Sequence, residues 1–178
     1  MKRFWASLAA LGIAALAIAS GFGRSAVANA SDGATKRDVV RFQTMFGDHA
    51  PFIGSAGAVR GVPAAPLPWM IGSVQGHLNK DGELVIDVDG LVLANDPSVP
   101  PSLRGTNPVP FFAAVVSCQT DSNGVVATDN LMTTNFPASM PGGNAHIDQK
   151  LTLSHPCVAP VVFVTAPNGS PWFAVTGG

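Results

Sequence analysis

Hydrophobic and polar residues alternate along much of this chain with the period of two that is typical of β-strands. The pattern is clearest in residues 83–93, where every second residue from Leu84 to Val88 is apolar. The sequence Asn-Lys-Asp-Gly at 79–82 comes just before, and Asp-Gly readily adopts the positive φ angles of a tight turn. We therefore predict a hairpin between a strand at 69–78 and the strand at 83–93.

Two other segments, residues 111–118 and 158–165, are almost continuously apolar, as expected for strands buried on both faces. Each has a cysteine at one end, Cys118 and Cys157 respectively. Further strands are predicted between loops rich in glycine and proline, at 38–46, 125–128, 144–153 and 172–176.

About eight to ten short strands with turn residues between them predict an all-β fold. Residues that favour helices are scarce, since Glu83 is the only glutamate in the chain. We predict an antiparallel β-sandwich with immunoglobulin-like character. A small β-barrel is the alternative fold.

The N-terminus has the composition of an export signal. Two basic residues at positions 2 and 3 precede an apolar run that continues to about residue 20, and Ala-Asn-Ala follows at 28–30. This pattern predicts a secretory signal peptide over residues 1–30, cleaved after Ala30. An uncleaved membrane anchor is the alternative, because the apolar run is close to the length of a membrane span.

The predicted mature chain, residues 31–178, is long enough for a single all-β domain with a sizeable core. Its first residues, about 31–37, are small and polar and are expected to form a flexible tail. Removing the signal peptide leaves 7 basic residues against 11 acidic residues, a net charge of −4. This charge disfavours nucleic acid as a partner, and no apolar run after Ser20 is long enough to span a membrane.

The two cysteines are predicted to form a disulfide, because an exported chain with an even number of cysteines usually pairs them. If the strands that carry Cys118 and Cys157 are antiparallel neighbours, the two thiols meet. Two free buried thiols or a redox pair are the alternatives, although the chain has no Cys-x-x-Cys sequence.

The sequence holds weak candidates for a metal site but no established metal motif, and we predict no cofactor. Asp87 and Asp89, followed by Gly90, resemble part of a calcium loop, and Asn95 and Asp96 lie near enough in sequence to contribute. In the predicted strand register, however, the carboxylates of Asp87 and Asp89 face water. The histidines do not have the spacing of a helical zinc site, and they are His49, His77, His146 and His155.

Common catalytic signatures are missing from the sequence. It contains neither Gly-x-Ser-x-Gly nor Ser-x-x-Lys, and it has no Gly-x-x-x-x-Gly-Lys loop for phosphate. There is no tyrosine, and the two tryptophans outside the predicted signal peptide, Trp69 and Trp172, each precede an apolar strand. Core packing is therefore a better interpretation of these tryptophans than a sugar-binding platform.

Several segments resemble a group of secreted bacterial proteins that have no assigned function. The resemblance covers most of the predicted mature chain and implies a bacterial extracytoplasmic protein, but it implies no activity, ligand or catalytic residue. The segments are Val-Arg-Gly-Val-Pro at 59–63, Leu-Pro-Trp at 67–69, Asn-Pro-Val-Pro-Phe at 107–111, Val-Val-Ser-Cys at 115–118, the run from Cys157 to Thr165, and the run from Trp172 to Gly177.

These observations predict a secreted, non-enzymatic β-sandwich protein with a binding or structural role and a partner that the sequence does not identify. The first alternative is an extracytoplasmic hydrolase with a site built from loops such as residues 95–110. A pocket that holds both a histidine and an aspartate of perturbed pKa would favour this alternative. The second alternative is a metal-binding module that uses the histidines and aspartates.

Overall fold

A computed structural model describes residues 37–177 of the chain, which form β-strands, connecting loops and one short 3-10 helix. The predicted signal peptide at 1–30, the cleavage site after Ala30 and residues 31–36 of the predicted tail lie outside the described residues. The described strands form a four-stranded sheet, a six-stranded sheet and a two-stranded ribbon, and all of their pairings are antiparallel.

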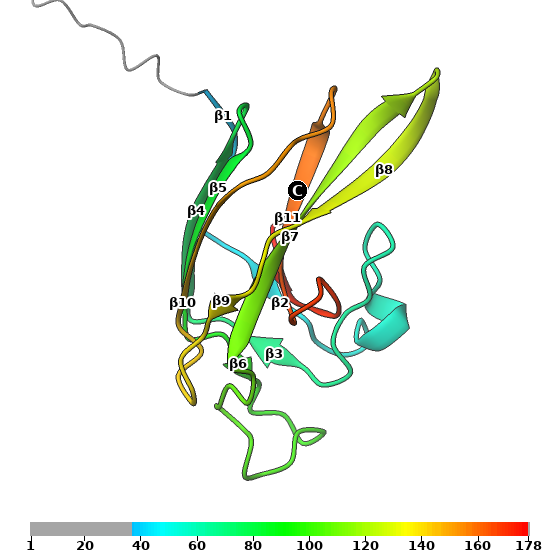
Figure 1. Cartoon of the computed structure of the whole chain (residues 1–178). Coiled ribbons are helices and arrows are strands. Elements are labelled where there is room, and N and C mark those ends of the chain that lie inside the picture. The colour runs from blue at the N-terminus through cyan, green and yellow to red at the C-terminus, as the bar shows by residue number, and fades with distance from the viewer. Residues whose placement is uncertain (1–36, 178) are drawn as a thin grey trace, which may run out of the picture. The chain divides into compact units, whose positions relative to one another are not determined.

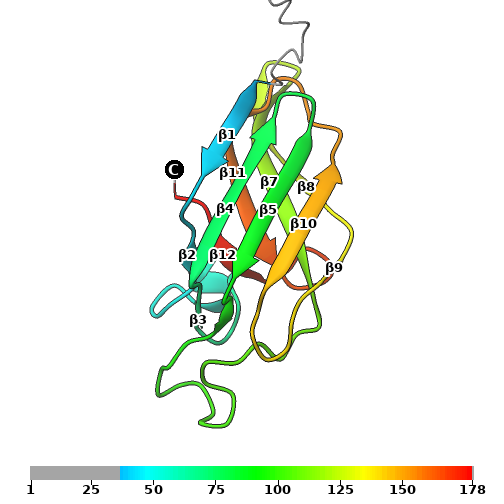
Figure 2. The same ribbon diagram turned by 90° about the vertical axis from the view of Figure 1, so that its left-hand side faces the viewer.

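The four-stranded sheet has the order β1-β4-β5-β10 and faces the viewer in Figure 2. The predicted hairpin forms its centre, with Leu78 opposite Leu84 on either side of the turn. Gly82 lies in this turn at a φ of +84°, a conformation that favours glycine. The strands are β1 (Asp38–Phe42), β4 (Ser73–Asn79), β5 (Glu83–Asp89) and β10 (Ala145–Lys150).

The six-stranded sheet has the order β2-β12-β11-β7-β8, and β9 pairs with the start of β7. Its strands are β2 (Phe46–Gly47), β7 (Phe111–Ser122), β8 (Val125–Met132), β9 (Phe136–Pro137), β11 (Val158–Thr165) and β12 (Trp172–Val175). The ribbon consists of β3 (Trp69–Met70) and β6 (Val92–Leu93).

The two large sheets pack face to face around one hydrophobic core, as Figure 1 shows from the side. Leu84, Ile86 and Ile147 of the four-stranded sheet are fully buried against apolar residues of the six-stranded sheet, among them Phe112 and Val162. The alternation of the sequence explains this arrangement, because Leu84, Ile86 and Val88 of β5 all point to one face. The predicted antiparallel sandwich is confirmed, and within residues 37–177 both large sheets stay open instead of closing into a barrel.

The predicted disulfide between Cys118 and Cys157 is confirmed, with the two Cα atoms 4.9 Å apart. It joins β7 to the residue that precedes β11, and these strands are antiparallel neighbours in which Val158 lies opposite Gln119. The bond therefore lies within one sheet, whereas the cystine of an antibody domain bridges its two sheets. β7 does not end at the cysteine as the sequence suggested, because its pairing with β8 continues to Ser122.

Three predicted strands are each divided between different sheets. The predicted strand at 83–93 continues from β5 of the four-stranded sheet into β6 of the ribbon. The predicted strand at 38–46 leaves the four-stranded sheet after Phe42, and Phe46 pairs with β12 in the six-stranded sheet. The predicted strand at 69–78 is interrupted at Gly72, whose N–H donates to the carbonyl oxygen of Asp89. All three interruptions move the chain from one sheet to another, a change that alternation alone does not reveal.

A loop covers part of the outer face of the six-stranded sheet, on the side away from the four-stranded sheet (Figure 1). It contains the 3-10 helix η1 (Gly54–Gly57), and Val62 and Ala64 of this loop pack on Val115, Phe163 and Trp172. The indole N–H of Trp172 donates to the carbonyl oxygen of Gly57 at 3.1 Å and fixes the loop to the sheet. Among residues 37–177, no helix is long and apolar enough to cross a membrane.

Candidate functional site

Most of the predicted metal-site candidates lie on the outer face of the four-stranded sheet. Four of them project from this face, namely His77, Asp87, Asp89 and His146. The position of the two aspartates agrees with the predicted register of β5. The direct contact among them is between His146 Nδ1 and Asp87 Oδ1, which are 2.6 Å apart. His49 and His155 lie in loops elsewhere.

These residues do not assemble into a metal centre in the part of the chain that the structure describes. Within residues 37–177, no three side chains of histidine, cysteine, aspartate or glutamate lie close enough together to hold a metal ion. Asp96, a candidate for the calcium loop, instead accepts hydrogen bonds from the hydroxyl and backbone N–H of Ser98. These bonds lower the pKa of its carboxyl group.

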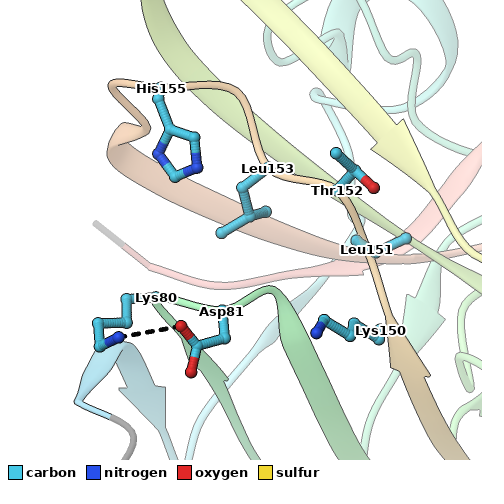
Figure 3. Close-up of a pocket in the computed structure, with 7 residues that line it drawn as sticks. All are labelled: Lys80, Asp81, Lys150, Leu151, Thr152, Leu153 and His155. Carbon is cyan, nitrogen blue, oxygen red and sulfur yellow. Dashed lines mark hydrogen bonds and ion pairs between the residues drawn. The ribbon is translucent and has the colours of Figure 1, made fainter.

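A surface cleft of about 570 Å³ contains His155 (Figure 3). It lies between the β4–β5 turn and the segment that follows β10, and Leu151 and Leu153 form part of its wall. Its charged groups include an ion pair between Lys80 Nζ and Asp81 Oδ1, which are 3.0 Å apart. Among the residues that line this cleft, none has a buried polar side-chain atom without a hydrogen-bond partner, so no unmet hydrogen bond in its wall points to a ligand.

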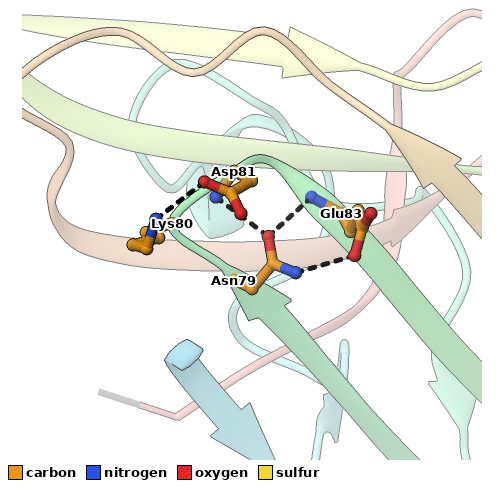
Figure 4. Close-up of polar contacts among 4 residues, drawn as sticks. All are labelled: Asn79, Lys80, Asp81 and Glu83. Carbon is orange, nitrogen blue, oxygen red and sulfur yellow. Dashed lines mark hydrogen bonds and ion pairs between the residues drawn. The ribbon is translucent and has the colours of Figure 1, made fainter. Parts of the chain in front are cut away.

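The turn beside this cleft is organised by a buried amide, as Figure 4 shows. The Asn79 side-chain oxygen accepts hydrogen bonds from the backbone N–H groups of Asp81 and Glu83, and its Nδ2 donates to Glu83 Oε2 at 2.8 Å. These bonds satisfy the polar atoms of Asn79 within the hairpin. The polar groups of the β4–β5 turn beside the cleft are therefore explained by their role in stabilising the hairpin.

A buried carboxyl group is found at Asp48, which directly follows β2. Its side chain is only 1% exposed, and its Oδ1 atom accepts a hydrogen bond from the backbone N–H of Trp69 at 2.8 Å. The other carboxyl oxygen, Oδ2, is buried without a hydrogen-bond partner among the described residues. An orphaned buried oxygen is costly, because it has lost its bonds to water and gained none in return.

Burial raises the pKa of Asp48 from 3.8 to about 7. Removal of the carboxylate from water disfavours its charged form, and this effect exceeds the opposing effects of nearby backbone N–H groups and His49. The backbone fixes the residue in this position, since its own N–H donates to the carbonyl oxygen of Phe173. Asp48 is therefore a rigidly held acid that titrates near neutral pH.

Asp48 forms part of the wall of a second cleft, which we call the aromatic cleft. Its volume is about 230 Å³, and it lies between the β2–β12 edge and the loop that carries η1. Two phenylalanines at its rim are strongly exposed, Phe46 by 61% and Phe52 by 58%. The lining residues are Phe46, Gly47, Asp48, His49, Phe52, Ala56, Gly57, Ala58, Val59, Trp172 and Val175.

The aromatic cleft also has a polar residue at its rim, His49. Its ring meets that of Phe52 edge to face, with centroids 6.3 Å apart, and its Nδ1 lies 3.0 Å from the carbonyl oxygen of Ala50. Asp48 is the only acidic residue among the lining residues, which include no lysine, arginine, serine or cysteine. The cleft thus combines aromatic surface with one buried acid and offers no hydroxyl or thiol nucleophile.

The sequence did not single out Asp48, although it predicted His49 as a weak candidate. One signal was available, since Asp48 is the only charged residue between Arg41 and Arg60. Its burial depends on Ala65, Trp69 and Phe173, which are remote in sequence. Comparisons with protein-family models, with curated proteins and with solved structures found no match to the chain.

Proposed function

We propose that the protein is an exported, non-enzymatic β-sandwich module that binds a small ligand in the aromatic cleft. One observation carries the proposal: Asp48, which lines a cleft whose rim exposes two phenylalanines, has a buried carboxyl oxygen without a partner among residues 37–177. Ligand sites typically combine an apolar concave surface with a few fixed polar groups. A volume of about 230 Å³ favours a ligand smaller than a typical drug molecule.

Export rests on separate support. The N-terminal sequence has the three parts of a signal peptide, and the described domain contains a disulfide, a bond typical of oxidising compartments. We infer that the protein is released outside the cytoplasm, and the resemblance to secreted bacterial proteins agrees with a bacterial origin. We expect N-terminal sequencing of the secreted protein to begin at Ser31, whereas an intact Met1 would contradict export by cleavage.

The binding proposal is tested by NMR titration of ¹⁵N-labelled mature protein with benzyl alcohol and with benzylamine. These two probes share an aromatic body that suits the volume of the cleft. We expect at least one of them to shift the signals of Gly47, Gly57 and the Trp172 indole, which line the cleft. If both leave these signals unchanged at millimolar concentration, the cleft is not a ligand site of this kind.

A second candidate function is a hydrolase, because Asp48 and His49 line the same cleft and the pKa of Asp48 is raised to about 7. A group that titrates near neutral pH is suited to act as a general base toward water. Against this candidate, His49 Nδ1 lies against the carbonyl oxygen of Ala50, and the cleft offers no hydroxyl or thiol nucleophile. Hydrolysis of simple aryl esters that is lost in Asp48→Asn would favour the enzyme over the binding module.

A further inference from the structure

We propose that the ligand of the aromatic cleft is a small organic cation, namely a protonated primary amine or an amidine attached to an apolar body. This inference rests on the proposed binding function and adds the chemical class of the ligand. It is carried by the unpartnered Oδ2 of Asp48 and by the aromatic rings at the rim.

The first step concerns the hydrogen bond that Asp48 lacks. Oδ1 is occupied by the N–H of Trp69, so Oδ2 is the atom that a ligand donor would satisfy. An ammonium or amidinium N–H supplies that donor together with a compensating charge, which makes a stronger bond than a neutral donor does. An anionic ligand would instead meet this carboxylate in a cleft without a lysine or arginine among its lining residues.

The second step concerns the aromatic surface. Phe46 and Phe52 expose more than half of their surface at the rim, and Trp172 is held at the wall by its bond to the carbonyl oxygen of Gly57. The faces of such rings attract cations and also pack against apolar groups. An amine on an apolar body therefore satisfies both parts of the cleft, whereas a sugar would need several more hydrogen-bonding side chains.

Access to Oδ2 requires a local movement of the cleft wall, because this atom has almost no exposed surface. The loop that carries η1 forms part of the cleft wall and includes Gly57, which approaches Phe52 so closely that a Cβ atom would lie 1.9 Å from the Phe52 carbonyl oxygen. We infer that binding shifts this segment slightly outward and exchanges the strained burial of Asp48 for an ion pair. The signals of Gly57 and of the Trp172 indole would report this shift.

The ionisation of Asp48 makes binding dependent on pH. With its pKa raised to about 7, the carboxyl group is mostly charged at pH 8 and mostly neutral at pH 5.5, while a primary alkylamine stays protonated at both. Affinity for an amine should therefore increase as the pH rises through 7. His49 is the ionisable neighbour that acts on Asp48, and the other groups that lower its pKa are the backbone N–H groups of Trp69, of Asp48 itself and of Ala65.

The experiment compares the affinities of benzylamine and benzyl alcohol by NMR titration at pH 8 and pH 5.5. For the wild-type chain we expect benzylamine to bind about tenfold more tightly than the alcohol at pH 8, and about equally at pH 5.5. Asp48→Asn should remove the preference at pH 8 but keep binding of the alcohol. Asp148→Asn, which removes an exposed carboxylate from the outer face of β10, should retain the preference. His49→Gln should keep the pH dependence, and its loss in this variant would overturn the assignment to Asp48.

The possible outcomes separate the two proposals. Equal binding of both probes to wild type at pH 8 overturns the cationic ligand but leaves the cleft as a binding site. A preference for benzylamine that persists in Asp48→Asn also overturns it, because the charge would then come from another group. If neither probe binds, the proposed binding function fails as well. Should Asp48→Asn not fold, the pH dependence of the wild-type chain alone decides, since a pH-independent ratio contradicts the proposal.

Discussion

Asp48 should make the stability of the protein depend on pH, and Asp48→Asn should remove this dependence. Because its pKa is higher in the folded chain than in the unfolded chain, the folded state holds the proton more tightly. The stabilisation from this proton is complete below pH 3.8 and is lost as the pH rises through about 7. Above pH 7 the folded protein therefore carries a buried charge that the unfolded chain exposes to water.

The raised pKa sets the magnitude. The difference between 3.8 and about 7 corresponds to an upper limit of about 4 kcal/mol, at 1.36 kcal/mol for each pH unit. Water that reaches the charged carboxylate reduces this value, so we expect about 2 kcal/mol. The free energy of unfolding of Asp48→Asn minus that of wild type should therefore increase by about this much from pH 4.5 to pH 8.5. Asparagine cannot titrate, so its own packing cost is the same at both pH values.

The measurement is urea unfolding of both proteins across this pH range, followed by the fluorescence of the buried Trp69 and Trp172. Groups that titrate equally in both proteins cancel in the difference between their free energies of unfolding. The same comparison for Asp148→Asn is the control, because this aspartate is exposed and its removal should leave the difference flat. A flat difference for Asp48→Asn as well would refute the reasoning.

Three other predictions follow from the packing. Replacing Cys118 and Cys157 together by alanine should lower the free energy of unfolding by up to about 4 kcal/mol, because the disulfide closes a loop with a sequence separation of 39 residues. Urea unfolding measures this loss, and an unchanged urea midpoint would contradict the prediction. Ile147→Ala should cost about 2–5 kcal/mol by the same assay, since the side chain is fully buried between the sheets, and a cost below about 1 kcal/mol would show that this part of the core repacks. Gly57→Ala should displace the loop over the aromatic cleft, because its Cβ would clash with the Phe52 carbonyl oxygen; NMR shifts confined to the cleft are expected, and an unperturbed Trp172 indole signal would argue against it.

Features that depend on residues close in sequence were predictable. The β4–β5 hairpin formed as expected because the turn at 79–82 and the alternation of β5 specify the same register. The cysteine pairing was predictable for a similar reason, since two apolar strands ending in cysteines need only become antiparallel neighbours. In these cases local pattern and tertiary structure agree.

Features that depend on contacts between distant segments were not predictable. Phe46 continues the alternation of β1 and was expected on the same strand, but the chain changes sheets after Phe42 and leaves Phe46 exposed at the aromatic cleft. The burial of Asp48 likewise arises from Ala65, Trp69 and Phe173, and no sequence period connects these residues. The candidate site therefore became visible only in three dimensions, while the fold class was evident from the pattern.

The disulfide has a consequence for how the chain responds to proteolysis. The segment that it closes, from Cys118 to Cys157, contains β8 and β9 of the six-stranded sheet but also β10 of the four-stranded sheet. A single cut in this segment, for example at the exposed Asn123–Gly124 turn, leaves the two fragments covalently joined. The bridge thus lets the nicked protein keep both of its sheets as one molecule until a reductant separates them.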